Sequence, residues 1–283
     1  MKISVSSYSF NQYLKSGKTD LFGTIEKAKE MGFDAIEFID IPSKDHEEEM
    51  SIAKQLKEKA DSVGIEINAY TVGACMCKST DEEDDKEFER VKGKIDVANV
   101  LGAKVFRHDA VFALERFRSF DLSLPTIAKN IRRISDYAKS FGIVTCIENH
   151  GKICQDSDRV ERLFNAVNHE NFGILLDVGN FACVDENNVM AVSRLAPYAV
   201  HVHFKDFKIV SRLAGRPDNC FESRACNYLK GTSIGYGDVN TEQCYAILKS
   251  IGYDGYLSVE YEGHEDCIDG IMRGFDNIKK YMS

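Results

Sequence analysis

The chain has 283 residues, of which 43% are hydrophobic and 29% charged, and its formal net charge is −9 at pH 7. This composition is typical of a globular protein that buries a sizeable core. The acidic balance argues against nucleic acid or an anionic membrane as a partner, because both require a basic surface. The sequence contains neither an apolar run long enough to span a bilayer nor a recognisable signal peptide. Its nine cysteines lack C-x-x-C spacing, which predicts reduced thiols and a cytoplasmic protein.

A repeating unit runs along the chain, in which an amphipathic helical stretch ends in glycine and an apolar strand follows at once. Glycine suits a helix C-terminus because the backbone there adopts a positive φ. Five such glycines occur: Gly32, Gly64, Gly102, Gly142 and Gly252. The first four are spaced by roughly one βα unit each.

Eight strands are predicted in total, at 3–7, 35–39, 66–71, 104–108, 144–148, 173–177, 199–204 and 256–260. Strict alternation of strands and helices leaves two architectures, a doubly wound sheet or a closed barrel. No G-x-G-x-x-G motif follows the first strand, which disfavours the nucleotide-binding sheet. We therefore predict an α/β protein, a single (β/α)₈ TIM barrel domain spanning 1–283.

The predicted seventh strand has an unusual polar face. Residues 198–206 read Y-A-V-H-V-H-F-K-D, in which apolar and polar side chains alternate with the period of a strand. His201, His203 and Lys205 therefore share one face. A basic face in so apolar a run needs polar partners.

In a TIM barrel, functional side chains lie at the C-terminal ends of the strands. The polar residues predicted there are Glu37, Arg107, His108, Glu148, Asp177, His203 and Glu260. Four of them close apolar runs of strands five to eight, namely Glu148, Asp177, His203 and Glu260. Three carboxylates in one dry pocket repel one another and would take up protons or a cation. With an imidazole beside them, they suit one divalent cation, Mn²⁺ first, with Mg²⁺, Co²⁺ or Zn²⁺ as alternatives.

Each of these residues also has a purely structural explanation. Asp177 precedes V-G-N and can cap the next helix. A glutamate at a strand end can form an ion pair with Arg107 or Lys205. The four together are harder to explain in this way than any one of them alone.

Several segments resemble motifs of the xylose isomerase-like family, the sugar phosphate isomerase/epimerase type of barrel. They are I-E-N-H-G, L-D-V-G-N, V-H-F-K-D and S-V-E-Y-E-G, together with the opening S-S-Y-S-F and G-F-D-A-I-E-F. The resemblance runs from Ile3 to about Ile278. It implies that Glu148, Asp177, His203 and Glu260 hold one divalent metal ion, and that Glu148 and Glu260 act as acid and base on either side of the substrate.

A metal-held carbonyl acidifies the neighbouring C–H, so that a carboxylate can remove the proton and form an enediolate. We therefore expect an isomerase or epimerase of a sugar or keto-sugar, with a free sugar preferred over a phosphorylated one because no glycine-rich phosphate cradle is evident. A dehydratase (lyase) of a keto-inositol or keto-sugar is the main alternative. Endonuclease IV-like DNA repair and a non-catalytic barrel are weaker ones. The oligomeric state is left open, with a homo-oligomer possible.

The sequence also departs from the family pattern. Many members carry a histidine three residues after the strand-six aspartate, whereas this chain has Asn180, which can bind a sugar hydroxyl but cannot take a proton. The absence of tryptophan argues against a true xylose isomerase. The long segment 207–237 is a candidate lid, and its Arg216 is a candidate substrate clamp or a solvated arginine.

Three further residues are secondary candidates for substrate binding. His150 follows Glu148 by two positions and can either reach the substrate or cap the next helix. Glu37 and Arg107 face the predicted mouth, where Glu37 can position sugar hydroxyls or pair with Arg107.

Overall fold

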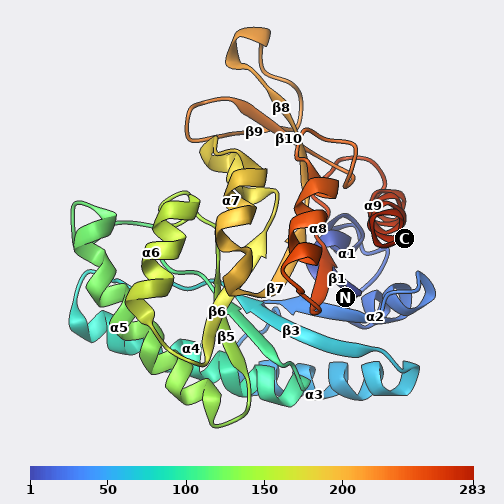
Figure 1. Ribbon diagram of the computed structural model, residues 1–283. Helices are drawn as coiled ribbons and strands as arrows, with labels where there is room; N and C mark the ends of the chain where they lie inside the picture. Colours follow the sequence, from blue (N-terminus) through green and yellow to red (C-terminus); the bar gives the residue numbers. More distant parts are fainter.

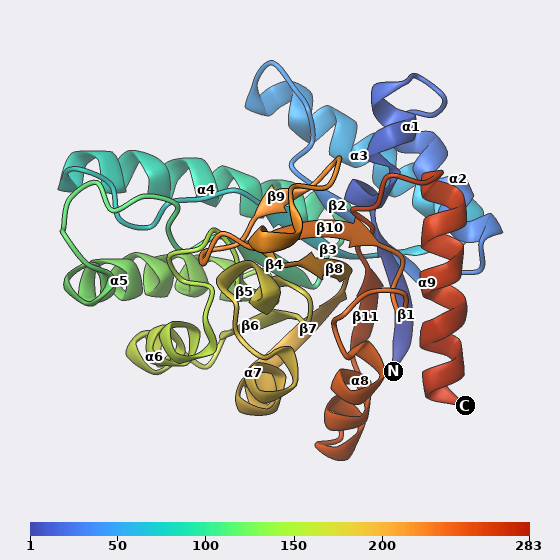
Figure 2. The same cartoon turned by 90° about the horizontal axis from the view of Figure 1, so that it is seen from above.

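A computed structural model describes all residues, 1–283. Eight parallel strands form a closed barrel in the order β1-β11-β7-β6-β5-β4-β3-β2, and helices surround it (Figures 1 and 2). The barrel strands are β1 (Lys2–Ser6), β2 (Ala35–Ile39), β3 (Glu66–Val72), β4 (Val105–His108), β5 (Val144–Glu148), β6 (Phe172–Asp177), β7 (Ala199–Phe204) and β11 (Tyr256–Val259). The predicted (β/α)₈ barrel is confirmed, and each predicted strand overlaps an observed one.

Nine α-helices accompany the barrel: α1 (Asn11–Lys15), α2 (Leu21–Glu30), α3 (His46–Val63), α4 (Asp81–Leu101), α5 (Phe120–Lys139), α6 (Ser157–Val167), α7 (Asn188–Leu195), α8 (Thr241–Ser250) and α9 (Cys267–Met282). Gly64 and Gly102 end α3 and α4 with φ of 70° and 77°, as the repeating glycines predicted. None of these helices combines the length and the apolarity that a bilayer crossing requires. All nine cysteines are free thiols.

Strand register determines which side chains meet inside the barrel. Asp177 is paired with His203, and His203 with Ser258 on the other side. Paired residues of parallel strands point to the same face of the sheet. His201, His203 and Lys205 are all buried, so the basic face of β7 is directed into the barrel.

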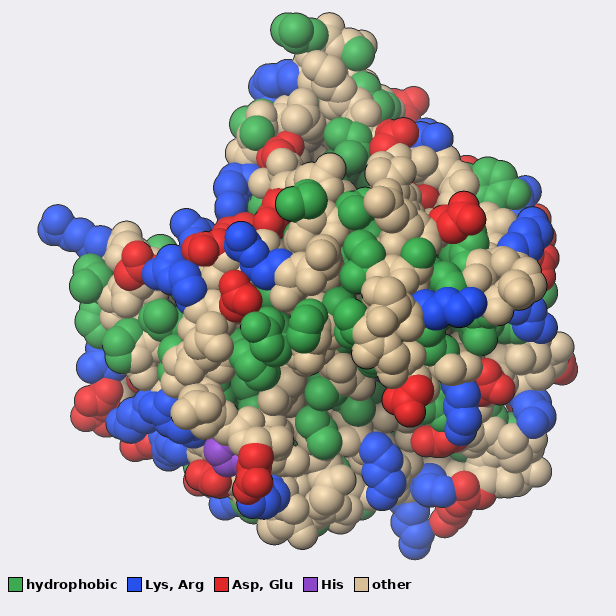
Figure 3. All heavy atoms as spheres, viewed as in Figure 1, with side chains coloured by type: hydrophobic (Ala, Val, Ile, Leu, Met, Phe, Trp, Pro, Cys, Tyr) green, Lys and Arg blue, Asp and Glu red, His purple; other side chains and the backbone are tan.

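The segment after β7 forms a second, antiparallel sheet in the order β8-β10-β9, which the sequence did not predict. Its strands are β8 (Asp206–Val210), β9 (Phe221–Glu222) and β10 (Tyr228–Thr232). In Figure 1 this sheet stands above the barrel, and from above β9 and β10 cross the barrel mouth (Figure 2). Figure 3 shows hydrophobic side chains at the top of this part of the molecule. Leu213, in the connection between β8 and β9, is 98% exposed.

Asp206 fastens this sheet to the barrel. Its carboxylate accepts hydrogen bonds from the backbone N–H groups of Phe207, Gly235, Gly237 and Val239, at 2.8–3.1 Å. A Cβ atom at Gly237 would lie 1.9 Å from Oδ1 of Asp206, so this close approach requires glycine. One buried carboxylate thereby holds both ends of the inserted segment 207–237 at the rim of the barrel.

Candidate metal centre

The four residues predicted as ligands converge at the C-terminal rim of the barrel. Glu148 and Asp177 end β5 and β6, His203 lies near the end of β7, and Glu260 directly follows β11. Nδ1 of His203 lies 3.8 Å from Oε1 of Glu148, 3.9 Å from Oδ2 of Asp177 and 3.6 Å from Oε2 of Glu260. One potential ligand atom of each residue lies within 4.8 Å of those of the others, and all four side chains are buried.

The donor set fits a divalent cation. Nδ1 of His203 has no hydrogen-bond partner, and the nearest carboxylate oxygen, Oε2 of Glu260, lies 3.6 Å away. Oδ2 of Asp177 and Oε2 of Glu260 have no partner except Nζ of Lys205. Buried polar atoms without partners are rare in folded proteins because each costs desolvation free energy. Three carboxylate oxygens and one imidazole nitrogen are ligands that Mn²⁺, Mg²⁺ and Co²⁺ accept. These residues are therefore able to hold such an ion.

Two buried cations border the carboxylates. Nζ of Lys205 lies 3.3 Å from Oδ2 of Asp177 and forms a further ion pair with Glu260. Nη2 of Arg107 lies 2.6 Å from Oε2 of Glu148. The ion pairs considered as an alternative explanation are thus present. The Arg107 pair leaves the cluster intact, because Glu148 uses Oε2 for Arg107 and turns Oε1 toward His203. Lys205 instead contacts the oxygens of Asp177 and Glu260 that face the cluster.

The two carboxylate oxygens of Asp177 also have different surroundings: Oδ1 binds backbone N–H groups, whereas Oδ2 faces the cluster. Its Oδ1 accepts hydrogen bonds from the backbone N–H groups of Gly179 (2.8 Å) and Asn180 (3.0 Å), at the start of a short 3₁₀ helix. Burial raises the pKa of this carboxyl to about 8, in spite of the charge of Lys205, and the charges of Glu148 and Glu260 raise it further.

A pH dependence of cation binding follows from this raised pKa. Below about pH 8 Asp177 retains a proton that a cation must displace, so we expect the apparent affinity for Mn²⁺ to rise with pH and to level off above about pH 8. One displaced proton corresponds to about a tenfold change per pH unit. Calorimetric titration in two buffers of different ionisation enthalpy measures the protons released. Constant affinity over this range would contradict the assignment.

Glu37 does not lie where the sequence placed it. Its Oε1 is 2.8 Å from Nε2 of His203 and its Oε2 is 2.6 Å from Nε2 of His201, so it neither faces the mouth nor pairs with Arg107. Burial alone would raise the pKa of Glu37, but the charges and hydrogen bonds of the two histidines hold it well below its ordinary value. With Nε2 of His203 directed at Glu37, Nδ1 is left for the carboxylate cluster.

We expect Glu37→Gln to weaken divalent-cation binding about 10- to 100-fold, because an amide no longer fixes the tautomer and orientation of His203 as a carboxylate does. Titration of the EDTA-treated variant with Mn²⁺ measures this change. Glu66→Gln, an exposed position at the start of β3, is the matched control. Equal affinities of Glu37→Gln and the wild type would show that Glu37 does not orient the ligand.

The mouth of the barrel is a cavity of about 290 Å³ beside the cluster, and Arg107 and His150 line it as expected. Nδ1 of His150 lies 2.8 Å from Oδ1 of Asp109, which also binds Arg107. His150 does not cap α6, because Asp156 does so. Asn180 donates a hydrogen bond of 2.8 Å to Oε1 of Glu148 and lines an adjoining cavity of about 200 Å³.

The structure does not support Arg216 as a substrate clamp. Its side chain is 61% exposed and lies 3.6 Å from Oε1 of Glu222 on the antiparallel sheet, and it lines none of the cavities around the cluster. Arg224, a second arginine of the segment 207–237, donates a hydrogen bond to the carboxylate of Asp156. The alternative of a solvated arginine on this segment fits Arg216.

Two acidic residues of the site were missed. Asp109 follows directly after β4 and joins Arg107 to His150. Glu262 stands two residues after Glu260 and lies 2.9 Å from Nζ of Lys205. The run V-E-Y-E-G contained a signal for Glu262, since alternate residues of an extended segment share a face.

Two curated proteins show how far the sequence similarity extends. Over 221 residues the chain is 28% identical to the rhizopine catabolism protein MocC of Rhizobium meliloti, covering 73% of this chain and 66% of that protein. Over 147 residues it is 24% identical to an inosose dehydratase of Lacticaseibacillus casei, covering 48% of this chain and 46% of the dehydratase. The chain thus spans about half to two thirds of the length of these relatives.

Solved structures share the fold over the full length. A probable 3-DHS dehydratase, AsbF from Bacillus anthracis, has a TM-score of 0.73 at 18% identity and covers 99% of both chains. The 3-keto-D-glucoside 4-epimerase YcjR from E. coli has a TM-score of 0.73 at 15% identity, also covering 99% of both. A barrel protein from Mycobacterium smegmatis in complex with magnesium has a TM-score of 0.72 at 16% identity and covers 99% of this chain and 96% of that one.

The similarity is also visible at the level of a family model. The model described as "Xylose isomerase-like TIM barrel" matches residues 25–281, which is most of the chain. This range contains the ends of β5 to β7 and the residue after β11, and hence all four residues of the cluster. The chain belongs to the xylose isomerase-like TIM barrel family.

Proposed function

We propose that this protein is a divalent-cation-dependent isomerase or epimerase that removes a proton next to the carbonyl group of a sugar or keto-sugar. The observation that carries the proposal is the convergence of Glu148 and Glu260 on Nδ1 of His203, a buried atom that has no hydrogen-bond partner. When bound, a divalent cation would polarise a substrate carbonyl and make the neighbouring C–H more acidic. Mn²⁺ is the preferred ion on the chemistry of the donor set.

The protein's own residues support proton transfer at this point. Glu148 is oriented by Arg107 at Oε2 and by the Asn180 amide at Oε1. Glu260 is oriented by Lys205. Each glutamate therefore has a fixed position, as a general base or acid requires. Removal and return of the proton on different carbons isomerises the substrate, and return on the opposite face epimerises it.

A dehydratase is the second candidate, because one of the curated relatives is named as an inosose dehydratase. The same proton removal, followed by loss of a β-hydroxyl group that takes up a proton from one of the two glutamates, would eliminate water. Asn180 is compatible with this alternative, since the amide can hold a hydroxyl group while the glutamates transfer the protons.

The test is solvent deuterium incorporation into a panel of keto-sugars and inososes, with the protein treated with EDTA and then supplied with Mn²⁺, Mg²⁺, Co²⁺ or Zn²⁺. We expect incorporation next to the carbonyl that requires the cation. An isomer or epimer as product supports the first candidate, and a product with a new C=C absorbance and one water fewer supports the second. If no compound incorporates deuterium and none loses water with any cation, the barrel is not a catalyst of this kind.

A further inference from the structure

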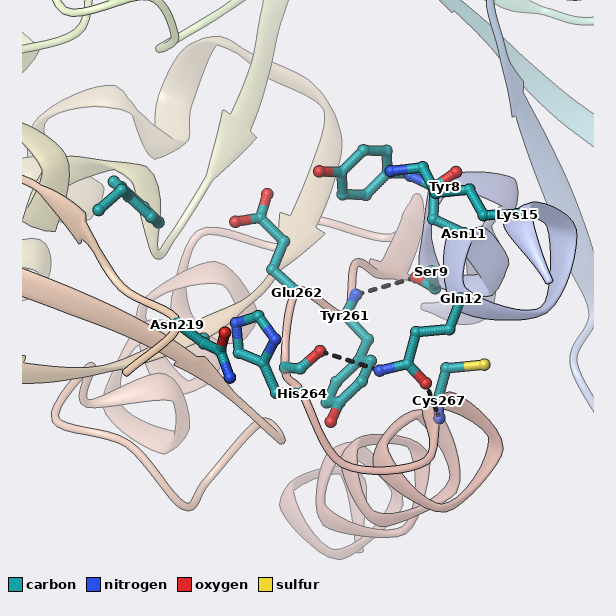
Figure 4. Close-up of a pocket in the computed structure, with 13 residues that line it drawn as sticks. Tyr8, Ser9, Asn11, Gln12, Lys15, Asn219, Tyr261, Glu262, His264 and Cys267 are labelled. Atoms are coloured by element: carbon teal, nitrogen blue, oxygen red, sulfur yellow. Dashed lines mark hydrogen bonds between the residues drawn. The ribbon is translucent and has the colours of Figure 1, made fainter. Parts of the chain in front are cut away.

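A second cavity, of about 310 Å³, adjoins the mouth cavity, and the proposed function does not use it. Tyr8 and Glu262 line both cavities, so they form the shared boundary. Figure 4 shows the Glu262 carboxylate and the Tyr8 ring near each other at one side of the cavity, with Gln12 and Cys267 at the other side. The two cavities therefore meet at Tyr8 and Glu262, and we call the second one the outer cavity.

The wall of the outer cavity is held in place. Gln12 donates to the backbone oxygens of Gly263 (3.4 Å) and Glu265 (2.8 Å) and accepts from the N–H of Cys267 (3.1 Å). Ser9 accepts a hydrogen bond of 2.9 Å from the N–H of Tyr261. These bonds brace the segment after β11, so the cavity is formed before any ligand arrives.

Other polar side chains of the outer cavity have no partner in the protein. Four line it and make no side-chain hydrogen bond or ion pair, namely the half-buried Asn11 and the exposed Lys15, Asn219 and His264. They offer two amides, an ammonium and an imidazole, which together donate and accept hydrogen bonds. The exposed part of the Phe221 ring and the Tyr8 ring add apolar faces.

The polar side chains and aromatic faces of the outer cavity suit a hydroxylated ring better than an anion. Sugar rings present hydroxyl groups to amides and C–H faces to aromatic rings. A phosphate or carboxylate placed at the inner end would meet the Glu262 carboxylate, which is repulsive although Lys205 offsets part of its charge. Each cavity, at about 310 and 290 Å³, is about as large as the smallest ligand pockets of proteins.

We propose that the outer cavity is a second sugar subsite, and that the substrate is a keto-glycoside whose reacting ring occupies the mouth while a second, neutral ring occupies the outer cavity. This inference rests on the proposed function for the reacting ring. Contacts to the second ring supply binding free energy away from the reacting atoms, which an enzyme can use to position the substrate.

A matched pair of compounds tests the subsite by activity. Methyl 3-keto-β-D-glucopyranoside and 3-keto-cellobiose carry the same reacting ring, and only the second compound has a second ring. We expect a kcat/KM for deuterium incorporation about tenfold higher with 3-keto-cellobiose. Asn219→Gly, which keeps the left-handed backbone of this residue (φ 56°), and His264→Ala should each reduce that ratio about three- to tenfold. Asn99→Ala, an exposed position on α4, is the control and should leave the ratio unchanged.

A second measurement separates failure of the subsite from failure of the proposed function. Saturation-transfer NMR with methyl β-D-glucopyranoside, which has no carbonyl group, detects binding to the outer cavity without any reaction. We expect a signal with the wild type and with Asn99→Ala, and its loss in Asn219→Gly combined with His264→Ala. Deuterium incorporation into neither keto compound and into no member of the panel of keto-sugars and inososes, with the NMR signal present, would contradict the proposed function alone. Equal kcat/KM for both compounds, or no NMR signal with the wild type, would overturn the subsite.

Discussion

Glu148→Gln and Glu260→Gln should each reduce solvent deuterium incorporation into a keto-sugar by about 10²- to 10⁴-fold, the range that positioned general bases contribute. Glutamine keeps the size of glutamate and one oxygen toward the cluster, but it cannot take up a proton at neutral pH. At position 148 the amide oxygen can accept from either Asn180 or Arg107, but the amide nitrogen then faces the other donor. Part of any loss at this position can therefore come from the disturbed Arg107 or Asn180 contact, which Glu260→Gln does not affect.

Since both glutamates are also candidate ligands, bound cation has to be measured in the same samples. A variant that retains Mn²⁺ at saturation and has lost incorporation identifies a base or acid. A variant that has lost both identifies a ligand. Glu58→Gln, an exposed glutamate on α3, is the matched control and should behave as the wild type. Full incorporation by both cluster variants with Mn²⁺ bound would remove the two glutamates from the mechanism.

The cluster was predictable because topology alone brings its residues together. Glu148, Asp177, His203 and Glu260 each close an apolar run, and the ends of neighbouring parallel strands meet at one rim of a barrel. Alternation along a strand then selects the inward face, which is why His201, His203 and Lys205 are all buried as expected. Neither step requires knowledge of side-chain packing.

Depth along the barrel was not predictable in the same way, and Glu37 shows why. Through Ala69 and Val105, Glu37 is in register with Val144, which lies four residues before Glu148 on β5. The shift in register from one strand to the next adds up around a barrel. The height at which a side chain lies inside the barrel therefore cannot be read from the sequence of its own strand. Glu37 consequently meets the histidines of β7 and not the substrate side of the mouth.

The antiparallel sheet above the barrel escaped prediction for another reason. β9 has only two residues and β10 contains Gly231, so neither shows the pattern of an independent strand. Their position depends on Asp206, whose partners at Gly235, Gly237 and Val239 lie about 30 residues further along the chain. Arg216 lies on this inserted segment beside Glu222 and not at the mouth. The order of the residues along the chain does not show this position.

Lys205→Met should destabilise the cation-free protein by about 3–5 kcal/mol, the usual cost of removing one partner from a buried ion pair. Nζ of Lys205 lies 3.3 Å from Oδ2 of Asp177 and 2.9 Å from Oε1 of Glu262, and it also pairs with Glu260. Methionine keeps the length of the side chain but leaves the carboxylates of Glu260 and Glu262, and above about pH 8 also that of Asp177, without their cation. Urea unfolding of the EDTA-treated proteins measures the loss, and Lys208→Met, exposed on β8, is the control.

The same variant should lose much less stability when saturated with Mn²⁺, because the ion would neutralise oxygens that Lys205 borders. In a thermodynamic cycle, a smaller loss in the cation-bound state requires that Lys205→Met binds the cation more tightly than the wild type. Lysine and the ion would then compete for Oδ2 of Asp177 and Oε2 of Glu260, both of which lack another hydrogen-bond partner. Equal losses with and without Mn²⁺ would mean that Lys205 and the cation do not share these oxygens, and the site would have to lie elsewhere in the barrel.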